Sequence, residues 1–328
     1  MKIDFSQHVS ASLPSEELKS QTANHSSSAL LNKRQAAVHS RISSLLARQI
    51  PPQPLFNLVP QNPFVIEAKK VDQITLLSGI SRYKLLEQLI TFAKPLARPP
   101  ISNYHVGAVG LGKSGNVYLG VNIEFKGFPL NQAIHGEQFL VANARNHGET
   151  ELVAIATSAA PCGHCRQFLN EIGNDHIEIL IPNCPPKKLS TLLPESFGPQ
   201  DLGVLGGLLT ATQVSKLSKH ACPVTAQAID AANASYAPYS QAIAGVAIKA
   251  TDGKIYSGSY LENAAFNPSL SPFHVALVAF VADMREYSDI CEVVLAEKAD
   301  GHVSQAGLIK QLVKGIAPQA TFKIELLR

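Results

Sequence analysis

The chain has 328 residues, of which 45% are hydrophobic and 16% charged, the composition of a globular protein with room for two cores. Its 28 basic and 25 acidic residues are interspersed and give a net charge of +3, so the sequence predicts neither nucleic-acid binding nor membrane-surface binding. No apolar run reaches the roughly 18 residues of a membrane-spanning helix, and the N-terminus lacks a secretory-signal pattern. We therefore expect a cytoplasmic protein that acts on a small molecule. The five cysteines, an odd number, favour reduced thiols over a disulfide framework.

The first half of the chain predicts helices that alternate with strands. Residues 1–54 read as a Ser- and Ala-rich leader followed by one helix, which ends at IPPQP. A helix from Ser81 to Ala97 precedes the alternating stretch HVGAVGLGKSGNVYLGVNIEF, which is typical of a β-hairpin. A second helix begins near His135, and LVAIAT, CRQFLNEI and HIEILIP follow as strand, helix and strand. This order predicts a layered α/β sandwich.

The second half repeats the first. It contains a helix from Thr225 to Ala234, the hairpin AGVAIKATDGKIYSGSY, a helix over 273–286, the strand CEVVLAEK, a helix over 304–315 and the strand ATFKIELL. A fixed offset of 138 pairs Ser102 with Ser240, Gly107 with Gly245, Tyr118 with Tyr256 and Glu124 with Glu262. We expect two copies of one fold, at 55–200 and 216–328, joined by a linker at 201–215.

One motif points to nucleotide binding, but its context does not. GAVGLGKS, residues Gly107 to Ser114, fits the phosphate-loop pattern, which must lead from a strand into a helix. The following NVYLGVNIEF is β-branched and alternating, and the second copy keeps the hairpin but loses the pattern. The segment is therefore predicted to be a hairpin tip.

The segment PCGHC predicts two metal ligands. Cys162 and Cys165 stand one helical turn apart at a helix start, where the helix dipole favours thiolates. A lone C-x-x-C also fits a redox pair or half of a structural zinc site. With His135 as a third ligand, zinc keeps one position open for water, and Glu137 is placed to move that water's proton. H-x-E followed by P-C-x-x-C is the known signature of zinc nucleobase deaminases.

From about residue 55 onward the chain resembles the cytidine deaminases, in particular the two-domain dimeric bacterial type. The segments SNYHVGAV, NIEFKG, PCGHCRQFLNE, SYAPYS and GSYLENAAFNP carry the resemblance. It implies two tandem three-layer α/β/α domains around mixed sheets, preceded by a helical N-terminal segment. It also implies a homodimer that holds one zinc ion per chain and hydrolyses cytidine and 2′-deoxycytidine to uridine, deoxyuridine and ammonia in pyrimidine salvage.

The resemblance also assigns roles to individual residues. The metal ligands of the family match His135, Cys162 and Cys165, and its general acid/base matches Glu137. The pair that binds the ribose matches Asn122 and Glu124, and the aromatic that packs on the pyrimidine matches Tyr104. Gly136 matches the position whose main chain lies beside the base, and Phe197 matches a segment that reaches into the neighbouring subunit's site. Asn122 and Glu124 could instead be ordinary polar residues of a strand, and Tyr104 a core aromatic. Arg166 could hydrogen-bond a thiolate or be an exposed helix residue.

The second copy lacks these residues. The offset of 138 places Phe273, Val275, Asp300 and Val303 at the positions of His135, Glu137, Cys162 and Cys165, and no second PCxxC occurs. We therefore expect a structural domain without zinc. The alternatives left open are a deaminase of a free base, nucleotide or polynucleotide, and a non-catalytic zinc-stabilised binding module.

The glycine in AIHGEQFL leads to two predictions. Residues two apart on a helix do not share a face, so His135 and Glu137 can converge only if they occupy the first turn. Gly136 replaces the alanine usual in the family and costs roughly 0.5 to 1 kcal/mol of local helix stability. The substitution Gly136→Ala is thus expected to raise stability and keep activity.

Overall fold

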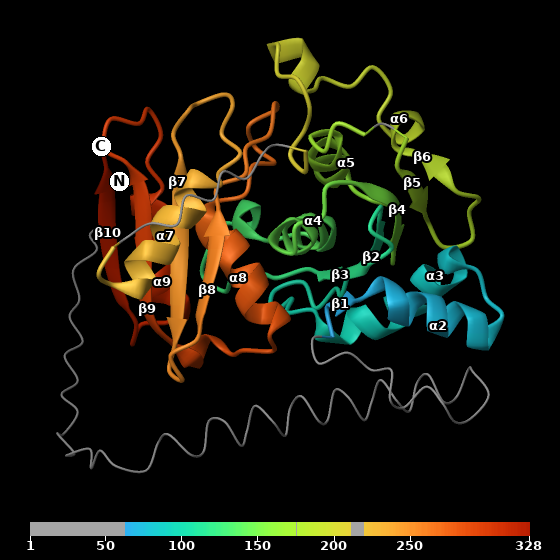
Figure 1. Ribbon diagram of the computed structural model, residues 1–328, viewed down its shortest axis with the longest axis horizontal. Coiled ribbons are helices and arrows are strands. Elements are labelled where there is room, and N and C mark those ends of the chain that lie inside the picture. The colour runs from blue at the N-terminus through green and yellow to red at the C-terminus, as the bar shows by residue number, and fades with distance from the viewer. Residues whose placement is uncertain (1–62, 175, 211–219) are drawn as a thin grey trace, which may run out of the picture.

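The computed structural model describes residues 63–174, 176–210 and 220–328. The predicted leader and helix of residues 1–54 lie outside these ranges. The described residues form two sheets, one of six strands in the order β1-β3-β2-β4-β5-β6 and one of four in the order β10-β9-β7-β8 (Figure 1). No helix in the described ranges has the length and apolar character needed to span a membrane.

The first copy contains the predicted elements and adds some at its margins. Its elements are β1 (Val65–Ile66), α2 (Ala68–Ser78), α3 (Arg82–Ala93), β2 (Gly107–Gly112), β3 (Val117–Val121), α4 (Gly136–Asn146), β4 (Leu152–Thr157), α5 (Gly163–Asn170), β5 (Glu178–Leu180), β6 (Lys187–Lys188) and α6 (Leu189–Leu192). The predicted helix 81–97 stops at Ala93, because Lys94–Leu96 tightens into a 3₁₀ turn that contains Pro95. The segment GAVGLGKS forms β2 and the hairpin turn, as predicted.

The second copy repeats this order. Its elements are α7 (Pro223–Asn233), β7 (Ala244–Ala250), β8 (Ile255–Ser259), α8 (Pro272–Ala282), β9 (Ile290–Lys298), α9 (Ala306–Ile316) and β10 (Thr321–Leu327). In both sheets the hairpin strands are antiparallel, and the last crossover pairs its strands in parallel, β4 with β5 and β9 with β10. The predicted mixed sheets are confirmed.

Each sheet is covered by helices on both faces. A Cβ on Gly107 of β2 would lie 3.1 Å from Ala93 of α3, whereas one on Gly110 would lie 3.1 Å from Leu140 of α4. Strand residues an odd number of positions apart point to opposite faces, so α3 and α4 lie on opposite sides of the sheet. In the second copy α7 covers one face, and α8 covers the other (Figure 1). The three-layer architecture is confirmed.

The equivalence between the copies changes register after Glu262. A Cβ on Gly120 would lie 2.3 Å from the carbonyl oxygen of Gly136, and one on Gly258 would lie 2.6 Å from that of Pro272. Ile123 bridges Ile134, and its counterpart Leu261 bridges Leu270, so the offset is 138 for the first partners but 136 for the second. The connection before α8 is therefore two residues shorter than the connection before α4.

This shift corrects the predicted counterparts of the metal-site residues. Ser271 caps α8 as His135 caps α4, so Ser271 and Phe273 stand in for His135 and Glu137, in place of the predicted Phe273 and Val275. Gln305 caps α9 as Cys162 caps α5, so Gln305 and Leu308 replace the predicted Asp300 and Val303. A fixed sequence offset could not register the changed loop lengths. The expectation that the second copy offers no metal ligands is unaffected.

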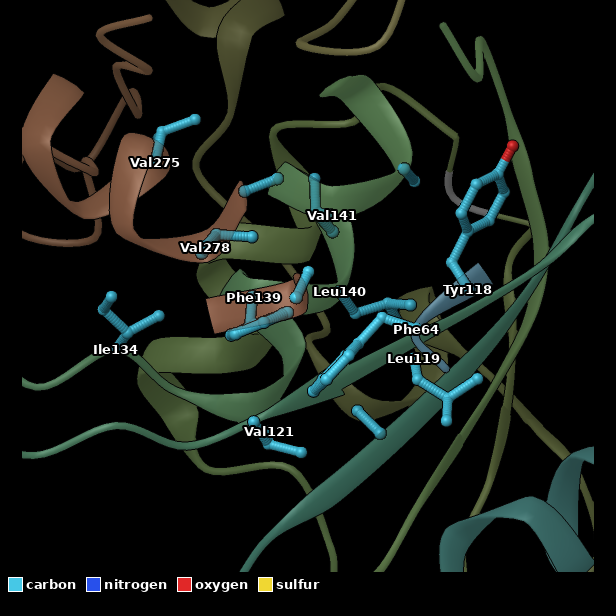
Figure 2. Close-up of a cluster of buried hydrophobic side chains, with 14 of the residues drawn as sticks. Phe64, Tyr118, Leu119, Val121, Ile134, Phe139, Leu140, Val141, Val275 and Val278 are labelled. Atoms are coloured by element: carbon cyan, nitrogen blue, oxygen red, sulfur yellow. The ribbon is translucent and has the colours of Figure 1, made fainter. Parts of the chain in front are cut away.

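The two copies share one hydrophobic core. Helices α4 and α8 pack against each other, and their buried side chains join those of β3 (Figure 2). Phe139 of α4 stacks on Phe64 with ring centroids 5.1 Å apart, while Val275 and Val278 of α8 close the other side. Full burial of such side chains stabilises the fold by roughly 1.5 to 3 kcal/mol each. The copies therefore support each other's stability.

A buried carboxylate connects the copies through polar contacts. Glu171, which follows α5, is fully buried and accepts hydrogen bonds from Tyr236 Oη (2.8 Å), the Ala264 amide (2.8 Å) and Tyr239 Oη. Its main-chain carbonyl accepts from the Leu208 amide at 2.8 Å. The chain is thus packed on the first copy as far as Leu208, within the predicted linker 201–215, of which residues 211–219 lie outside the described ranges.

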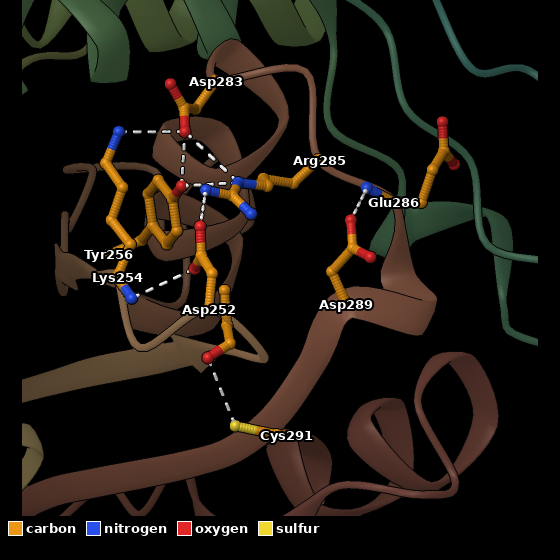
Figure 3. A network of polar contacts seen from close by, with 9 residues as sticks. Asp252, Lys254, Tyr256, Asp283, Arg285, Glu286, Asp289 and Cys291 are labelled. Atoms are coloured by element: carbon orange, nitrogen blue, oxygen red, sulfur yellow. Dashed lines mark hydrogen bonds and ion pairs between the residues drawn. The ribbon is translucent and has the colours of Figure 1, made fainter. Parts of the chain in front are cut away.

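The hairpin of the second copy is fixed at its turn by an arginine. Arg285 lies 2.5 Å from Asp252 and 3.3 Å from Asp283, and its Nε donates to Tyr256 Oη (Figure 3). Its main-chain carbonyl also accepts a hydrogen bond from Arg98 of the first copy at 2.7 Å. This network joins the β7–β8 turn to the end of α8 and to the neighbouring copy.

Candidate active site

Helix α4 begins where the metal motif requires it. His135 is the N-cap and Glu137 the second helical residue, which confirms the predicted first-turn placement. The His135 amide donates to Gln138 Oε1 at 3.0 Å, and the Ile123–Ile134 bridge holds the preceding chain against the end of β3. Both functional side chains are thereby fixed at the positive end of the helix.

Helix α5 begins on the second half of the motif. Cys162 is its N-cap, and its sulfur accepts a hydrogen bond from the Cys165 amide at 3.4 Å. Arg166 donates to the Pro161 carbonyl through Nε and to the Leu192 carbonyl through Nη1, both at 2.9 Å. The hydrogen bonds of Arg166 therefore go to the backbone on either side of the motif. Arg166 therefore neither hydrogen-bonds a thiolate nor lies free on the helix surface, the two alternatives that the sequence left open. Its side chain instead holds the motif in position.

The three predicted ligands converge on one point. Cys162 Sγ and Cys165 Sγ lie 3.5 Å apart, and His135 Nδ1 lies 3.6 and 3.4 Å from them. Usual zinc–ligand bond lengths in a tetrahedron give about 3.8 Å between two sulfurs and about 3.6 Å between sulfur and nitrogen. Among the His, Cys, Asp and Glu side chains of the described residues, these three form the one group whose ligand atoms lie close enough together to hold a metal ion. One nitrogen and two sulfurs at these separations fit zinc.

Electrostatics also favour a cation here. Hydrogen bonds from Cys165 and His135 lower the pKa of the Cys162 thiol to about 3. The Cys162 thiolate in turn raises the pKa of Cys165, so without a cation the pair holds one proton between them. A divalent ion at the centre of the triangle would displace that proton and neutralise both sulfurs.

Glu137 lies next to the ligands in a closed environment. Its side chain is 4% exposed, and Oε2 lies 3.1 Å from Cys165 Sγ. Burial raises the pKa of Glu137. A carboxyl group at this position is close enough to the metal position to exchange protons with a molecule bound beside it.

A pocket of 330 Å³ opens over the triangle. Its lining comprises Ser102, Tyr104, Val106, Asn122, Glu124, Ala133, Ile134, His135, Gly136, Glu137, Ala159, Ala160, Cys162 and Cys165. It therefore brings together eight of the nine predicted site residues, all except Phe197. Its apolar walls and few polar groups are typical of a small-molecule site.

Asn122 and Glu124 lie together at the end of β3. Asn122 donates to the Tyr104 carbonyl and accepts from the Val106 amide, at 2.9 and 2.8 Å. Glu124 accepts from the amides of Ile101 and Ser102, both at 2.9 Å, and from Ser102 Oγ at 2.5 Å. Although burial raises the pKa of Glu124, these hydrogen bonds outweigh it and lower that pKa. Both side chains thus hold the pocket wall formed by residues 101–106.

The two predicted aromatics lie at the surface. Tyr104 lines the pocket mouth with 59% of its surface exposed, so the alternative of a core aromatic is wrong. Phe197 is 49% exposed and lies outside the pocket lining, with its carbonyl accepting from Gln167 and Asn170 of α5. Within one chain Phe197 does not reach the site.

Several site residues were missed by the sequence analysis. His164, inside PCGHC, stacks on His135 with ring centroids 4.8 Å apart and limits the orientation of that ring. Ser102 donates two hydrogen bonds to Glu124, and its match with Ser240 in the repeat is a sequence signal that could have identified it. Val106, Ala159 and Ala160 are small apolar side chains that carry no sequence signal of their own.

Gly136 sits against a side chain across the pocket floor. A Cβ at this position would lie 3.0 Å from Val106 Cγ1 and 3.7 Å from Ala108 Cβ. An alanine therefore requires Val106 to move by a few tenths of an ångström. The stability gain expected from helix propensity alone is offset by this contact.

The fold and the ligand set define a class of protein, the zinc-binding α/β deaminases. Two family models described as "Cytidine and deoxycytidylate deaminase zinc-binding region" match residues 82–181 and 189–310. Cytidine deaminases of Yersinia pestis (strain Pestoides F) and Yersinia pseudotuberculosis serotype IB (strain PB1/+) are each 43% identical over 244 residues, which cover 74% of this chain and 83% of theirs. The crystal structure of cytidine deaminase from Mycobacterium tuberculosis is 31% identical, covers 36% of this chain and 99% of its own, and has a TM-score of 0.34. The chain belongs to the cytidine deaminase family.

Proposed function

We propose that the first copy catalyses the hydrolytic deamination of cytidine and 2′-deoxycytidine to uridine and 2′-deoxyuridine, with release of ammonia. The observation that carries the proposal is the triangle of His135, Cys162 and Cys165 with the Glu137 carboxyl 3.1 Å from one sulfur, at the floor of a 330 Å³ pocket. Three protein ligands leave the fourth zinc position open, whereas a structural site closes all four. This favours an enzyme over a zinc-stabilised binding module.

The residues divide the chemistry among them. Bound by His135, Cys162 and Cys165, zinc would supply Lewis acidity that lowers the pKa of a water molecule. Glu137 takes a proton from the attacking water and delivers it to ring nitrogen N3, while the water oxygen bonds to C4. Glu137 then carries the second proton to the amino group as the C4–N bond breaks, so that one water is consumed for each ammonia released.

The pocket favours a nucleoside over a nucleotide. None of the described residues that line it is Lys or Arg, and Glu124 contributes a negative charge beside the position proposed for the sugar. A phosphate there would be repelled, whereas Glu124 and Asn122 can accept and donate hydrogen bonds to ribose hydroxyls. Tyr104 at the mouth and the Gly136 main chain are proposed to bracket the pyrimidine ring.

We further propose that the protein is a homodimer in the cytoplasm, with one zinc per chain and with domains at 55–200 and 216–328 about a linker at 201–215. The apolar side chains of Phe197, Leu202, Leu205 and Phe266 are exposed, Leu205 to 96%, and burying them against a second copy would remove this apolar surface from water. Phe197 would then complete the partner's pocket. All five cysteines lie in the described residues and none of them forms a disulfide there, which suits a reducing compartment.

A substrate comparison tests the function directly. Purified zinc-loaded protein is incubated with cytidine, 2′-deoxycytidine, cytosine and CMP, and ammonia release is followed. Turnover of both nucleosides with little of the base or nucleotide is expected. Ammonia from CMP or cytosine at rates above those of the nucleosides would contradict the assignment. Light scattering during gel filtration checks the dimer, and Leu205→Asp is expected to give a monomer.

A further inference from the structure

The second copy retains a pocket where the first copy has its active site. It is lined from the second copy by Tyr260, Asn267, Ser269, Leu270, Ser271, His274, Gln305 and Leu308, and from the first by Asn131, Gln132, Ala133, Gln138 and His164. Three of these are counterparts of ligands: Ser271 of His135, Gln305 of Cys162 and Leu308 of Cys165. We call this cavity the relic pocket. A cavity thus lies between the copies at the position that corresponds to the metal site of the first copy.

A buried histidine in the relic pocket lacks a partner. His274 is 5% exposed, its ring stacks on Phe125 with centroids 5.7 Å apart, and its Nε2 has no hydrogen-bond partner. Buried polar atoms in native proteins are nearly always satisfied, and His274 belongs to the pocket lining, so its unpaired nitrogen calls for a partner at the edge of the relic pocket. Nothing in the activity proposed for the first copy requires His274.

The relic pocket selects for an uncharged ligand. The described lining contains no Lys, Arg, Asp or Glu side chain, and burial lowers the pKa of His274 to about 4. The relic pocket therefore offers no carboxylate to pair with an ammonium group and no lysine or arginine to pair with a phosphate or a carboxylate. The side chains of Gln305, Asn267 and Gln132 offer amide donors and acceptors, the groups that recognise the edge of a nucleobase.

Size restricts the ligand further. The relic pocket measures 160 Å³, against 330 Å³ for the catalytic pocket. An apolar cavity of about 150 Å³ holds one benzene ring. The relic pocket therefore has room for a single six-membered ring within its walls.

We infer that the relic pocket binds one uncharged pyrimidine base per chain, held by a hydrogen bond to His274 and by the surrounding amides. This site is separate from the catalytic pocket, and its occupancy does not depend on turnover. This binding is a property beyond the proposed deamination, and a measurement of base binding is enough to test it.

Calorimetric titration of the zinc-loaded protein with uracil tests the inference. One binding event per chain is expected. His274→Phe keeps the ring stack but removes the nitrogens and should weaken binding at least tenfold, roughly the contribution of a hydrogen bond. Leu308→Phe fills the cavity without removing a polar group and should abolish binding, which decides the matter if His274→Phe does not fold.

Two variants serve as controls. Ala160→Phe narrows the catalytic pocket and His302→Phe alters an exposed histidine, and both should bind uracil as the unaltered protein does. Absence of any uracil binding would overturn the inference, as would binding that survives in Leu308→Phe but is lost in Ala160→Phe. Because no step requires turnover, an inactive enzyme would refute the proposed function and leave this test intact.

Discussion

The two copies hold the same loop in the same way, although only one has a metal site. Glu124 accepts from the amides of Ile101 and Ser102 and from Ser102 Oγ. Its counterpart Glu262 accepts from the amides of Tyr239 and Ser240 and from Ser240 Oγ. Because the same hydrogen bonds form in the second copy, which lacks the metal ligands, the first role of this carboxylate is to shape the loop beside the strand. A carboxylate repeated in both copies is thus no sign of catalysis by itself.

The turn ends of the hairpins show the opposite case, in which the same position is held by different chemistry. In the first copy buried Glu149 accepts from Ser114 Oγ and from Tyr118 Oη at 3.2 Å. In the second copy the turn end is held by Arg285, with Asp283 and Tyr256 (Figure 3). The tyrosine is common to both, but the charge at the centre is reversed. Structural networks tolerate such exchange because any satisfied polar group suffices, whereas a metal site does not.

Removing a metal ligand should give the largest difference between the copies. His135→Ala is expected to lose bound zinc and all turnover, since one of three protein ligands is gone. Ser271→Ala, at the equivalent position, should keep about one zinc per chain. Elemental analysis of dialysed protein measures both. A zinc content near two in the unaltered protein would show that the second copy binds metal after all.

Changing the proton carrier comes next. Glu137→Gln should retain zinc and lower kcat by about 10²- to 10⁴-fold, the usual contribution of general acid–base catalysis. Phe273→Leu, its counterpart, should leave kcat within about twofold and cost around 1 kcal/mol of unfolding free energy. Steady-state ammonia release and zinc analysis report both variants. Substantial turnover by Glu137→Gln would remove Glu137 from the mechanism.

Substitution of Glu124 and of its counterpart Glu262 should separate support of the loop from binding of the substrate. Glu124→Gln and Glu262→Gln should each lower the unfolding free energy by about 1 to 2 kcal/mol, because each weakens charge-assisted hydrogen bonds. Only Glu124→Gln should also lower kcat/KM, by about tenfold or more, through the ribose contact. Urea unfolding and steady-state kinetics are compared for the pair. Equal kinetic losses would leave Glu124 with a supporting role alone.

The contact between the copies should respond to high pH. Burial, together with the nearby Glu171 carboxylate, raises the pKa of Tyr236 above its ordinary value of about 10. The unfolded chain therefore loses this proton first, so the contribution is complete below about pH 10 and declines as the pH rises further. Urea midpoints between pH 8 and 11 measure this decline. Tyr236→Phe should be less stable by about 1 to 3 kcal/mol at pH 8, since Glu171 loses a donor, and should decline less steeply.

The smallest effect concerns the glycine that distinguishes the start of α4. Gly136→Ala should keep zinc and change the unfolding free energy by less than about 0.5 kcal/mol, since better helix propensity is offset by contact with Val106. Adding Val106→Ala should reveal the gain relative to Val106→Ala alone. Thermal denaturation of the four proteins completes the cycle. Full stabilisation by Gly136→Ala alone would mean that Val106 moves without cost.

Elements whose pattern lies within a few neighbouring residues could be predicted from the sequence. Alternation and helical periodicity located the hairpins and most helices, but the polar helix Ala68–Ser78 was missed because its apolar stripe is short. The constant offset of 138 no longer identified the correct counterparts after Glu262. The loop before α8 is two residues shorter than the loop before α4, and no pair of matching residues in the sequence reveals that difference. The partners of Arg166 were out of reach, because Leu192 approaches it only through the packing of α6 on α5.

The sequence by itself determined the ligand types, the H-x-E and C-x-x-C spacings and the first-turn position of His135 and Glu137, because these depend on residues within one helical turn. Only the tertiary structure decided that the starts of α4 and α5 converge to within 3.4 to 3.6 Å between ligand atoms. It also decided that Gly136 meets Val106 and that a second pocket lies between the copies. Such contacts join residues far apart in the chain, and packing against a shared core fixes them.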